Sequence, residues 1–413
     1  MRTSVGSLTC NHHYTIKIIM EGDFIKINEW LLPLSWLYGI GVKTRNILFD
    51  IGVLKSQSFD VPIISVGNIT VGGTGKTPHV EYLIELLQNK YKVAVLSRGY
   101  KRKSKGFAIA SKESTMRDIG DEPFQLHTKY PKITVAVDKD RCHGIQTLTE
   151  SLPSASSSNS NIDVVLLDDA FQHRYVKPGV NILLVDYHRL IIYDQLLPAG
   201  RLREPLSGKN RADIVIVTKC PADLKPMEYR VITKAMNLFP YQQLYFTTLT
   251  YGDLQPIFCG ENRPLNSITP NDHVLLLTGI ASPKQMMLDL SPYTPHITPL
   301  TYGDHHDFTP SDLAHINEIF NKMPSPKLII TTEKDATRLM GKDGLSEEVR
   351  HHLFTLPVHI HFMLDQAEKF NDFILGYMVK NSRNSILVKA KSNNAQKGRQ
   401  EKTPAAFSST IRF

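Results

Sequence analysis

The chain has 413 residues, of which 41% are hydrophobic and 21% charged, a composition typical of a soluble globular protein with about two domains. Its four cysteines are far apart and form no CxxC, which argues against a disulfide framework or a structural zinc site and suits a reducing cytoplasm. The formal net charge of +8 does not indicate nucleic-acid binding, because residues 380–413 hold five Lys and three Arg against one Glu, and the rest of the chain contributes only +1.

The two ends of the chain differ from its middle. Residues 1–27 are an N-terminal extension of uncertain status, since Lys17 interrupts its apolar stretch, no cleavage site for a signal peptide follows, and either Met1 or Met20 could be the start. Residues 380–413 are polar and low in complexity, so we expect a basic disordered tail whose removal leaves activity unchanged. Contact between this tail and acidic lipid headgroups is the alternative.

Residues 28–60 are predicted to form a helical segment that associates with membranes. The apolar run 30–42 is too short for a membrane span, which needs about 20 residues. It contains Trp30 and Trp36, and Lys43 and Arg45 follow it. Aromatic side chains next to basic ones suit a helix lying in the membrane interface. A helix packed on the protein's own core remains an equal alternative.

The stretch VGNITVGGTGKTP (66–78) predicts a phosphate-binding loop. An apolar run at 63–66 reads as a buried strand, and 78–88 follows as an amphipathic helix, with Pro78 in its first turn. Backbone N–H groups of such a loop bind phosphate oxygens, Lys76 would reach the terminal phosphates, and the Thr77 hydroxyl would bind Mg²⁺. The strict pattern GxxxxGK[ST] fails at its first glycine. The predicted loop comprises Thr70, Val71, Gly72, Gly73, Thr74, Gly75, Lys76 and Thr77.

A second acidic cluster follows the predicted strand 164–167, which ends in Asp168 and Asp169. A carboxylate at the end of a neighbouring parallel strand can hold Mg²⁺ directly or through water. Asp186, at the end of another predicted strand, is a competitor. We prefer the first pair, because Gln172 and His173 cluster beside it.

The predicted fold class is α/β: a P-loop NTPase-type, mostly parallel sheet with helices on both faces, plus a second, smaller α/β domain. Predicted strands alternate with helical or loop segments, which is typical of a parallel sheet whose ligands bind beyond the carboxyl ends of the strands. We expect the core domain at 61–207 and a second domain at 208–379 that closes the active-site cleft. The strands are predicted at 63–66, 93–97, 134–137, 164–167, 182–185, 214–217, 274–277 and 327–332.

Three further polar positions are ambiguous on local grounds. Asp121 begins a predicted helix, where it could be a functional carboxylate or only a cap. Arg141 lies just past a predicted strand end. The loop GDHHDF (303–308) invites a metal site, but adjacent residues rarely bind one ion, so His305 facing an interdomain cleft and simple surface polarity are the stronger alternatives.

Taken in order, VGNITVGGTGKTP, SRGY, GDEP, DDAFQH, LPAGRLREP, GDHHDF and TTEKDATRL resemble the tetraacyldisaccharide 4′-kinases. The resemblance covers about residues 28–375 and is specific as a combination. It implies transfer of the γ-phosphate of ATP to the 4′-hydroxyl of an acylated glucosamine disaccharide 1-phosphate, with Mg²⁺, to form the lipid A precursor lipid IVA. It also implies two α/β domains with the active site between them. The chain departs from the family at Ala170, where Gly is usual, which leaves local geometry in doubt unless φ is negative there.

The resemblance also implies residue roles. Residues 70–77 would hold ATP, with Lys76 on the transferring phosphate and Thr77 and one acid of Asp168 and Asp169 at Mg²⁺. Arg141 and Arg203 would handle phosphate, Gln172 and His173 would line the nucleotide site, and Asp121 and His305 would form the catalytic pair.

The resemblance further implies peripheral binding to the cytoplasmic face of the inner membrane of a Gram-negative bacterium, which favours the interfacial interpretation of residues 30–42, and we expect a monomer. The alternative is a P-loop metallochaperone or nucleotide switch without a lipid substrate. A GTP-binding switch would carry [NT]KxD, but the nearest match, TKCP (218–221), has Pro where the Asp belongs, which favours ATP.

Overall fold

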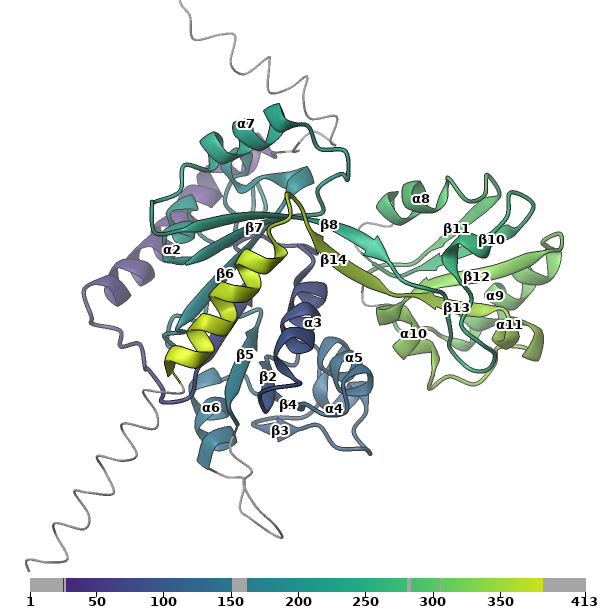
Figure 1. Ribbon diagram of the computed structural model, residues 1–413, viewed down its shortest axis with the longest axis horizontal. Coiled ribbons are helices and arrows are strands. Elements are labelled where there is room, and N and C mark those ends of the chain that lie inside the picture. Colours follow the sequence, from purple (N-terminus) through teal and green to yellow (C-terminus); the bar gives the residue numbers. More distant parts are fainter. Residues whose placement is uncertain (1–24, 26, 151–161, 281–283, 305, 382–413) are drawn as a thin grey trace, which may run out of the picture.

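The structure is a computed structural model that describes residues 25, 27–150, 162–280, 284–304 and 306–381. The predicted N-terminal extension up to residue 24, the predicted tail from residue 382 and His305 lie outside the described residues. Two sheets organise the described chain into a larger and a smaller α/β part (Figure 1). This arrangement confirms the predicted fold class.

Within the described residues, the larger sheet has nine strands in the order β14-β8-β7-β6-β1-β5-β2-β4-β3, and the strands from β8 to β4 are mutually parallel. Its strands are β1 (Ile63–Gly67), β2 (Val93–Ser97), β3 (Ala108–Ile109), β4 (Thr134–Val137), β5 (Val164–Asp168), β6 (Val180–Asp186), β7 (Ile214–Thr218), β8 (Gln243–Tyr251) and β14 (Val358–Phe362). Its helices include α3 (Lys76–Leu87), α4 (Met116–Ile119), α5 (Asp121–Lys129), α6 (Arg141–Glu150), α7 (Pro226–Met236) and a last helix at 367–381.

Strands β1 and β5, in the middle of the larger sheet, are buried along their whole length, so both faces of the sheet are covered. Alternate side chains of a strand point to opposite faces. One face packs on α3 and the last helix, with Ile64 and Val66 against the cluster that contains Ile84 and Ile374. The other face packs on α6, through Ile145 and its neighbours. This two-sided burial explains why near-continuous apolar runs predicted the strands well.

The smaller sheet has the order β11-β10-β12-β13-β9 and is parallel except for β9. Its strands are β9 (Gln255–Pro256), β10 (His273–Thr278), β11 (Ile297–Thr301), β12 (Lys327–Thr332) and β13 (Leu353–Leu356), and its helices are α8 (Lys284–Leu290), α9 (Pro310–Lys322), α10 (Glu333–Leu339) and α11 (Glu347–His351).

Sheet membership differs from the predicted second domain at 208–379. Strands β7, β8 and β14 belong to the larger sheet, and the last helix packs on it, so the smaller sheet is built from residues between 255 and 356. The reason is the antiparallel pairing of β14 with β8, from Val358 opposite Tyr251 to Phe362 opposite Thr247, which brings the chain back to the sheet that it left. The two strands also form the connection between the two parts (Figure 1).

The predicted interfacial segment forms η1 (Glu29–Leu31) and α2 (Leu32–Asp50), which begins with a proline in its first turn. One side of α2 contacts the larger part through Ser35 and Phe49, which are buried. The other side of α2 exposes large apolar side chains, including Trp36, 69% exposed, and Trp30 in the preceding η1 is 93% exposed. None of the helices in the described ranges combines the length and hydropathy that a membrane span requires.

The last residue of β1, Gly67, lies too close to Phe171 to carry a side chain. A Cβ atom at Gly67 would lie 2.8 Å from Cβ and 2.9 Å from the backbone N of Phe171. Gly67→Ala should therefore lower the free energy of unfolding by about 1–3 kcal/mol, as overpacking does. Gly41→Ala in α2 is the control, because its Cβ would meet nothing within 4 Å. Urea unfolding of both variants tests this, and equal midpoints would contradict it.

Candidate active site

The predicted phosphate-binding loop connects β1 to α3. Gly72 (φ 122°) and Gly75 (φ 77°), the N-cap of α3, adopt positive φ values that side-chain-bearing residues rarely tolerate. Two hydrogen bonds hold Thr74 at the tip: Asn68 Nδ2 donates to its hydroxyl at 2.8 Å, and the Thr218 hydroxyl donates to its carbonyl oxygen at 3.0 Å. The loop therefore leads into the N-terminus of α3, whose first backbone N–H groups are suited to bind a phosphate group.

A segment more than a hundred residues later lies against this loop. The backbone N of Val71 donates to the Arg201 carbonyl oxygen, and the backbone N of Arg203 donates to the Ile69 carbonyl oxygen, both at 2.8 Å. This short pairing belongs to the motif LPAGRLREP and places Arg203 beside the loop.

Asp169 joins the loop to this segment. Its carboxylate lies 3.5 Å from Lys76 Nζ and 3.4 Å from Arg203 Nη1. Burial acts to raise the pKa of Asp169, but the positive charges of Lys76 and Arg203 outweigh it and lower the pKa. Asp169 thus contacts both Lys76 and Arg203, the three being residues expected from the sequence to act on phosphate and Mg²⁺.

Asp168 has the opposite environment. Its side chain is almost completely buried, and its Oδ1 has no hydrogen-bond partner among the described residues. Burial, followed by the charges of Glu122 and Asp169, raises its pKa to about 7. A buried carboxylate oxygen without a partner is costly unless a cation occupies the site. The donor set of Asp168 and its neighbours therefore fits Mg²⁺, which prefers oxygen ligands.

Arg141 is the first residue of α6 and is buried close to Asp168. Burial lowers its pKa, and the charge of Asp168 opposes that shift. Its Nε has no hydrogen-bond partner among the described residues, although Nη1 donates to the Lys139 carbonyl oxygen. A buried guanidinium with an unsatisfied donor suits contact with phosphate oxygens.

The Gln172 side chain connects the acidic loop to the phosphate-binding loop. Its amide nitrogen donates to the Asn68 carbonyl oxygen and lies 3.4 Å from Glu204 Oε1. Glu204 is buried and forms an ion pair with Arg211 at 2.9 Å. Gln172 therefore links the segment after β5 to the segments that contain Asn68 and Glu204.

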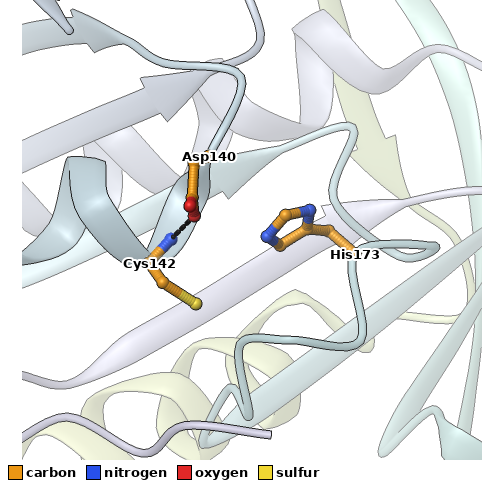
Figure 2. Close-up of side chains that lie close together, drawn as sticks. All are labelled: Asp140, Cys142 and His173. Atoms are coloured by element: carbon orange, nitrogen blue, oxygen red, sulfur yellow. Dashed lines mark hydrogen bonds between the residues drawn. The ribbon is translucent and has the colours of Figure 1, made fainter. Parts of the chain in front are cut away.

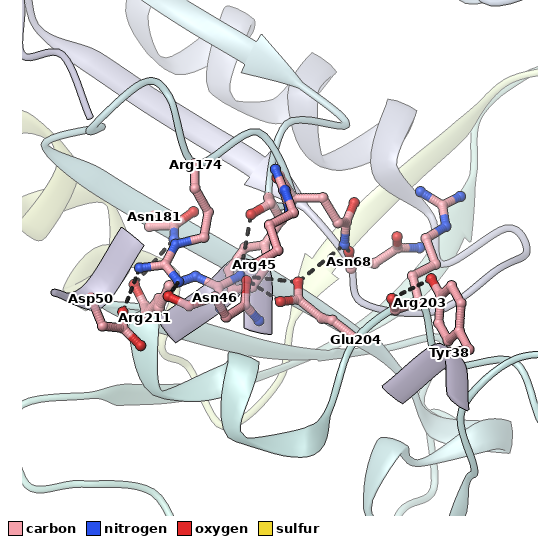
Figure 3. A network of polar contacts seen from close by, with 12 residues as sticks. Tyr38, Arg45, Asn46, Asp50, Asn68, Arg174, Asn181, Arg203, Glu204 and Arg211 are labelled. Atoms are coloured by element: carbon pink, nitrogen blue, oxygen red, sulfur yellow. Dashed lines mark hydrogen bonds and ion pairs between the residues drawn. The ribbon is translucent and has the colours of Figure 1, made fainter. Parts of the chain in front are cut away.

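Helix α2 contacts the same loops from outside (Figure 3). The Tyr38 hydroxyl donates to the Arg203 carbonyl oxygen at 2.7 Å, and Arg45 Nη2 donates to the Gln172 carbonyl oxygen at 3.1 Å. The inner side of α2 is thus hydrogen-bonded to two segments of the site.

His173 lies beside Asp140 and Cys142, with one potential ligand atom of each within 4.8 Å of the others (Figure 2). Burial, then the charge of Arg141, lowers the pKa of His173 to about 4. Burial and the charge of Asp140 raise the pKa of Cys142 to about 11, so the thiol stays protonated at neutral pH. The positive charge of Arg141 close to His173 disfavours a metal cation here.

Asp121 is the first residue of α5, and Gly120 is the N-cap, so Asp121 is not the cap that its sequence position also allowed. Its carboxylate pairs with Arg338 Nη2 at 2.6 Å. Its neighbour Glu122 is near enough to Asp168 to raise the pKa of that residue. The start of α5 therefore borders the acidic pair, and His305 cannot be placed because it lies outside the described residues.

The competing acid Asp186 forms an ion pair beside the phosphate-binding loop. It pairs at 2.7 Å with Lys219, whose Nζ also donates to the Gly73 carbonyl oxygen. Ala170, where the family usually has Gly, does not adopt a positive φ, whereas Asp169 does (φ 48°). The extra methyl group at Ala170 is therefore compatible with the backbone.

The sequence analysis did not identify several residues that contact the predicted ones. Glu204 and Arg338 lie inside motifs that it quoted, LPAGRLREP and TTEKDATRL, but had no assigned role. Asn68 likewise lies inside VGNITVGGTGKTP without an assigned role. Lys219 and Arg45 lie outside these motifs and are found only through their contacts.

Comparisons with known proteins identify the family of this chain. Residues 27–378 match the family described as tetraacyldisaccharide-1-P 4′-kinase. The chain is similar to the tetraacyldisaccharide 4′-kinases of Phocaeicola vulgatus (59% identical, covering 89% of this chain and 99% of the relative) and Porphyromonas gingivalis (45%, 86% and 98%). Among solved structures, it is similar to LpxK of Aquifex aeolicus in complex with ATP, with 29% identity, a TM-score of 0.65, and coverage of 85% of this chain and 99% of that one. The chain therefore belongs to the tetraacyldisaccharide-1-P 4′-kinase family.

Proposed function

We propose that this protein transfers the γ-phosphate of ATP to the 4′-hydroxyl of a tetraacyldisaccharide 1-phosphate, forming lipid IVA. Family membership supports the reaction, and the similar Aquifex structure with ATP supports the phosphate donor. The observation that carries the proposal is the contact of Lys76 and Arg203 with Asp169 beside a glycine-rich loop. This arrangement serves phosphoryl transfer, which depends on positioning and on charge around the transferred group.

In the proposed reaction, the 4′-hydroxyl loses its proton, its oxygen forms a bond to the γ-phosphorus, and the bond from that phosphorus to the bridging oxygen breaks, so ADP leaves. Lys76, Arg203 and Arg141 would stabilise the negative charge on the transferring group. Asp121 with His305 would accept the proton, because a sugar hydroxyl is a poor nucleophile.

Mg²⁺ would be held by Thr77, Asp168 and Asp169, and it would neutralise charge on the β- and γ-phosphates. The unpartnered Oδ1 of buried Asp168 supports this assignment most directly. Asp169 is already paired with Lys76 and Arg203, so we favour Asp168 as the direct ligand.

The exposed apolar side of α2 supports peripheral binding of a monomer to the cytoplasmic face of the inner membrane. Its exposed side chains include Trp36, Leu37 and Ile40, and Trp30 in the preceding η1 is also exposed. Such a surface suits insertion at the boundary between headgroups and acyl chains, where the lipid substrate would lie. The sequence left a metallochaperone or nucleotide switch as the alternative. Membership of a kinase family argues against it.

Transfer of labelled γ-phosphate from ATP to the purified tetraacyldisaccharide 1-phosphate tests the proposal. Lys76→Ala should reduce this transfer at least about 10³-fold, because it removes positive charge from the transferring group in a buried site. Lys90→Ala is the control and should keep full activity, because Lys90 is exposed in the turn that follows α3. Near-normal turnover by Lys76→Ala, with the fold verified by circular dichroism, would rule out the loop assignment.

Replacing Trp30 and Trp36 by Ser should lower binding to vesicles of anionic phospholipid while ATP affinity is unchanged, because both rings are exposed and would be buried in the interface. Leu288→Ser, an equally exposed apolar residue on α8, should bind vesicles like the parent protein. Vesicle flotation and ATP titration provide the two measurements. Unchanged flotation of the double variant would mean that α2 is not the membrane contact.

Asp121→Asn and His305→Ala should each lower kcat by about 10²–10⁴ with little change in the KM for ATP, the range expected for loss of a general base. The double variant should be no slower than the slower single variant, because residues that act as a unit are not additive. Asp118→Asn, an acid in the first turn of neighbouring α4, is the control. Losses that multiply would show that the two residues act independently, and full kcat in Asp121→Asn would exclude a catalytic carboxylate.

A further inference from the structure

Helices α5 and α10 face each other across the junction of the two parts of the molecule (Figure 1). Ion pairs between described residues cross this junction, among them Arg338 with Asp121 at 2.6 Å, Lys129 with Glu333 at 2.7 Å, and Lys334 with Glu122 at 3.7 Å. Helix α10 carries the motif TTEKDATRL, to which the proposed reaction assigns no role. The pair with Asp121 is notable because it reaches the proposed general base.

The guanidinium of Arg338 is held rigidly on its own side. The residue is 3% exposed, and its Nη1 donates to Asp335 Oδ1 at 2.9 Å. Asp335 is completely buried, and its Oδ2 accepts hydrogen bonds from the backbone N of Gly279 at 2.8 Å and the Thr332 hydroxyl at 2.7 Å. A planar guanidinium fixed on one edge presents its remaining donors in a defined direction.

Those remaining donors meet one atom of Asp121. Nε at 3.1 Å and Nη2 at 2.6 Å both donate to Asp121 Oδ2. Because the Arg338 side chain is buried, these charge-assisted bonds are less weakened by water than bonds on an open surface. The contact therefore holds Oδ2 of Asp121, and with it one end of the carboxylate, in a defined position.

The same helix reaches the loop that precedes His305. Lys334 lies 3.6 Å from Asp304, the residue before His305 in the sequence, and 3.7 Å from Glu122. Helix α10 thus contacts both the start of α5 and the GDHHDF loop, the two places from which the proposed proton acceptors come.

We infer that Arg338 is a positioning residue for phosphoryl transfer: from the smaller part it orients the Asp121 carboxylate of the larger part toward the acceptor hydroxyl. The inference rests on the proposed function. It differs from a merely structural role, because an ion pair that only joins the two parts would be replaceable by the other pairs at the same junction. A base displaced by about 1 Å loses about 10²-fold in rate, so the orientation of this carboxylate matters.

Arg338→Met in the full chain should lower kcat about 10²-fold, with the KM values for ATP and the lipid acceptor changed less than about threefold. Arg338→Lys, which retains the charge, should recover part of the loss. Glu333→Gln is the matched control, since it removes another ion pair at the junction without touching Asp121, and its kcat should stay within about threefold of the parent. Full kcat in Arg338→Met, or an equal loss in Glu333→Gln, would overturn the inference.

Removing Arg338 leaves the buried Asp335 carboxylate without its cation, which can destabilise the fold. The variant Asp335→Asn with Arg338→Met avoids this, because the amide oxygen can still accept from Gly279 and Thr332. It should show the same loss of kcat with a melting temperature near that of the parent. A parental kcat in this double variant would overturn the inference.

A double-mutant cycle with Asp121→Asn separates the roles. Adding Arg338→Met to Asp121→Asn should lower kcat by less than about twofold further, since Arg338 acts through Asp121. A further loss equal to that in the parent background would show that Arg338 acts elsewhere. Failure of the parent enzyme to phosphorylate the lipid acceptor would reject the proposed function itself, an outcome distinct from all of these.

Discussion

The Asp169 carboxylate between Lys76 and Arg203 is the contact on which the arrangement of the site depends. It joins the loop after β1, the end of β5 and the segment before η4 (Leu206–Arg211), which are distant in the sequence. The adjacent Asp168 has the opposite electrostatics: the pKa of Asp169 is lowered by its cationic partners, and that of Asp168 is raised to about 7 by burial and by neighbouring carboxylates. Opposite shifts suit different tasks: Asp169 links the loops, and in the proposed reaction Asp168 would be the direct ligand for Mg²⁺.

The sequence predicted the larger sheet well, because its central strands are buried on both faces and appear as apolar runs. It did not predict which sheet receives each strand. In β8, buried and half-buried positions are mixed, and its partner β14 begins more than a hundred residues later, opposite Tyr251. Local patterns carry no information on such a pairing, so the strands that return to the larger sheet were assigned to the second domain.

The candidate site shows the same division. Glycines with positive φ, a lysine at the start of a helix and acids at a strand end follow from local geometry, and the sequence identified them. Asp121 did not have a unique local interpretation, because an acid in the first turn of a helix is also stabilised by the helix dipole. Its partner Arg338 is on another helix of the other part, and only the tertiary structure reveals the pair.

Helix α2 links the two requirements of a kinase whose acceptor is a lipid. Its outer side exposes apolar and aromatic side chains, and its inner side is hydrogen-bonded to the carbonyl oxygens of Arg203 and Gln172 in the site. Ser35 adds a further connection, because its hydroxyl donates to the Leu196 carbonyl oxygen and accepts from the backbone N of Ala199. These bonds prevent α2 from turning independently of the loops. The orientation that α2 takes at a membrane surface would therefore also set the orientation of Arg203 and Asp169 toward that surface, so that recognition of the lipid and alignment of the phosphate depend on one rigid unit.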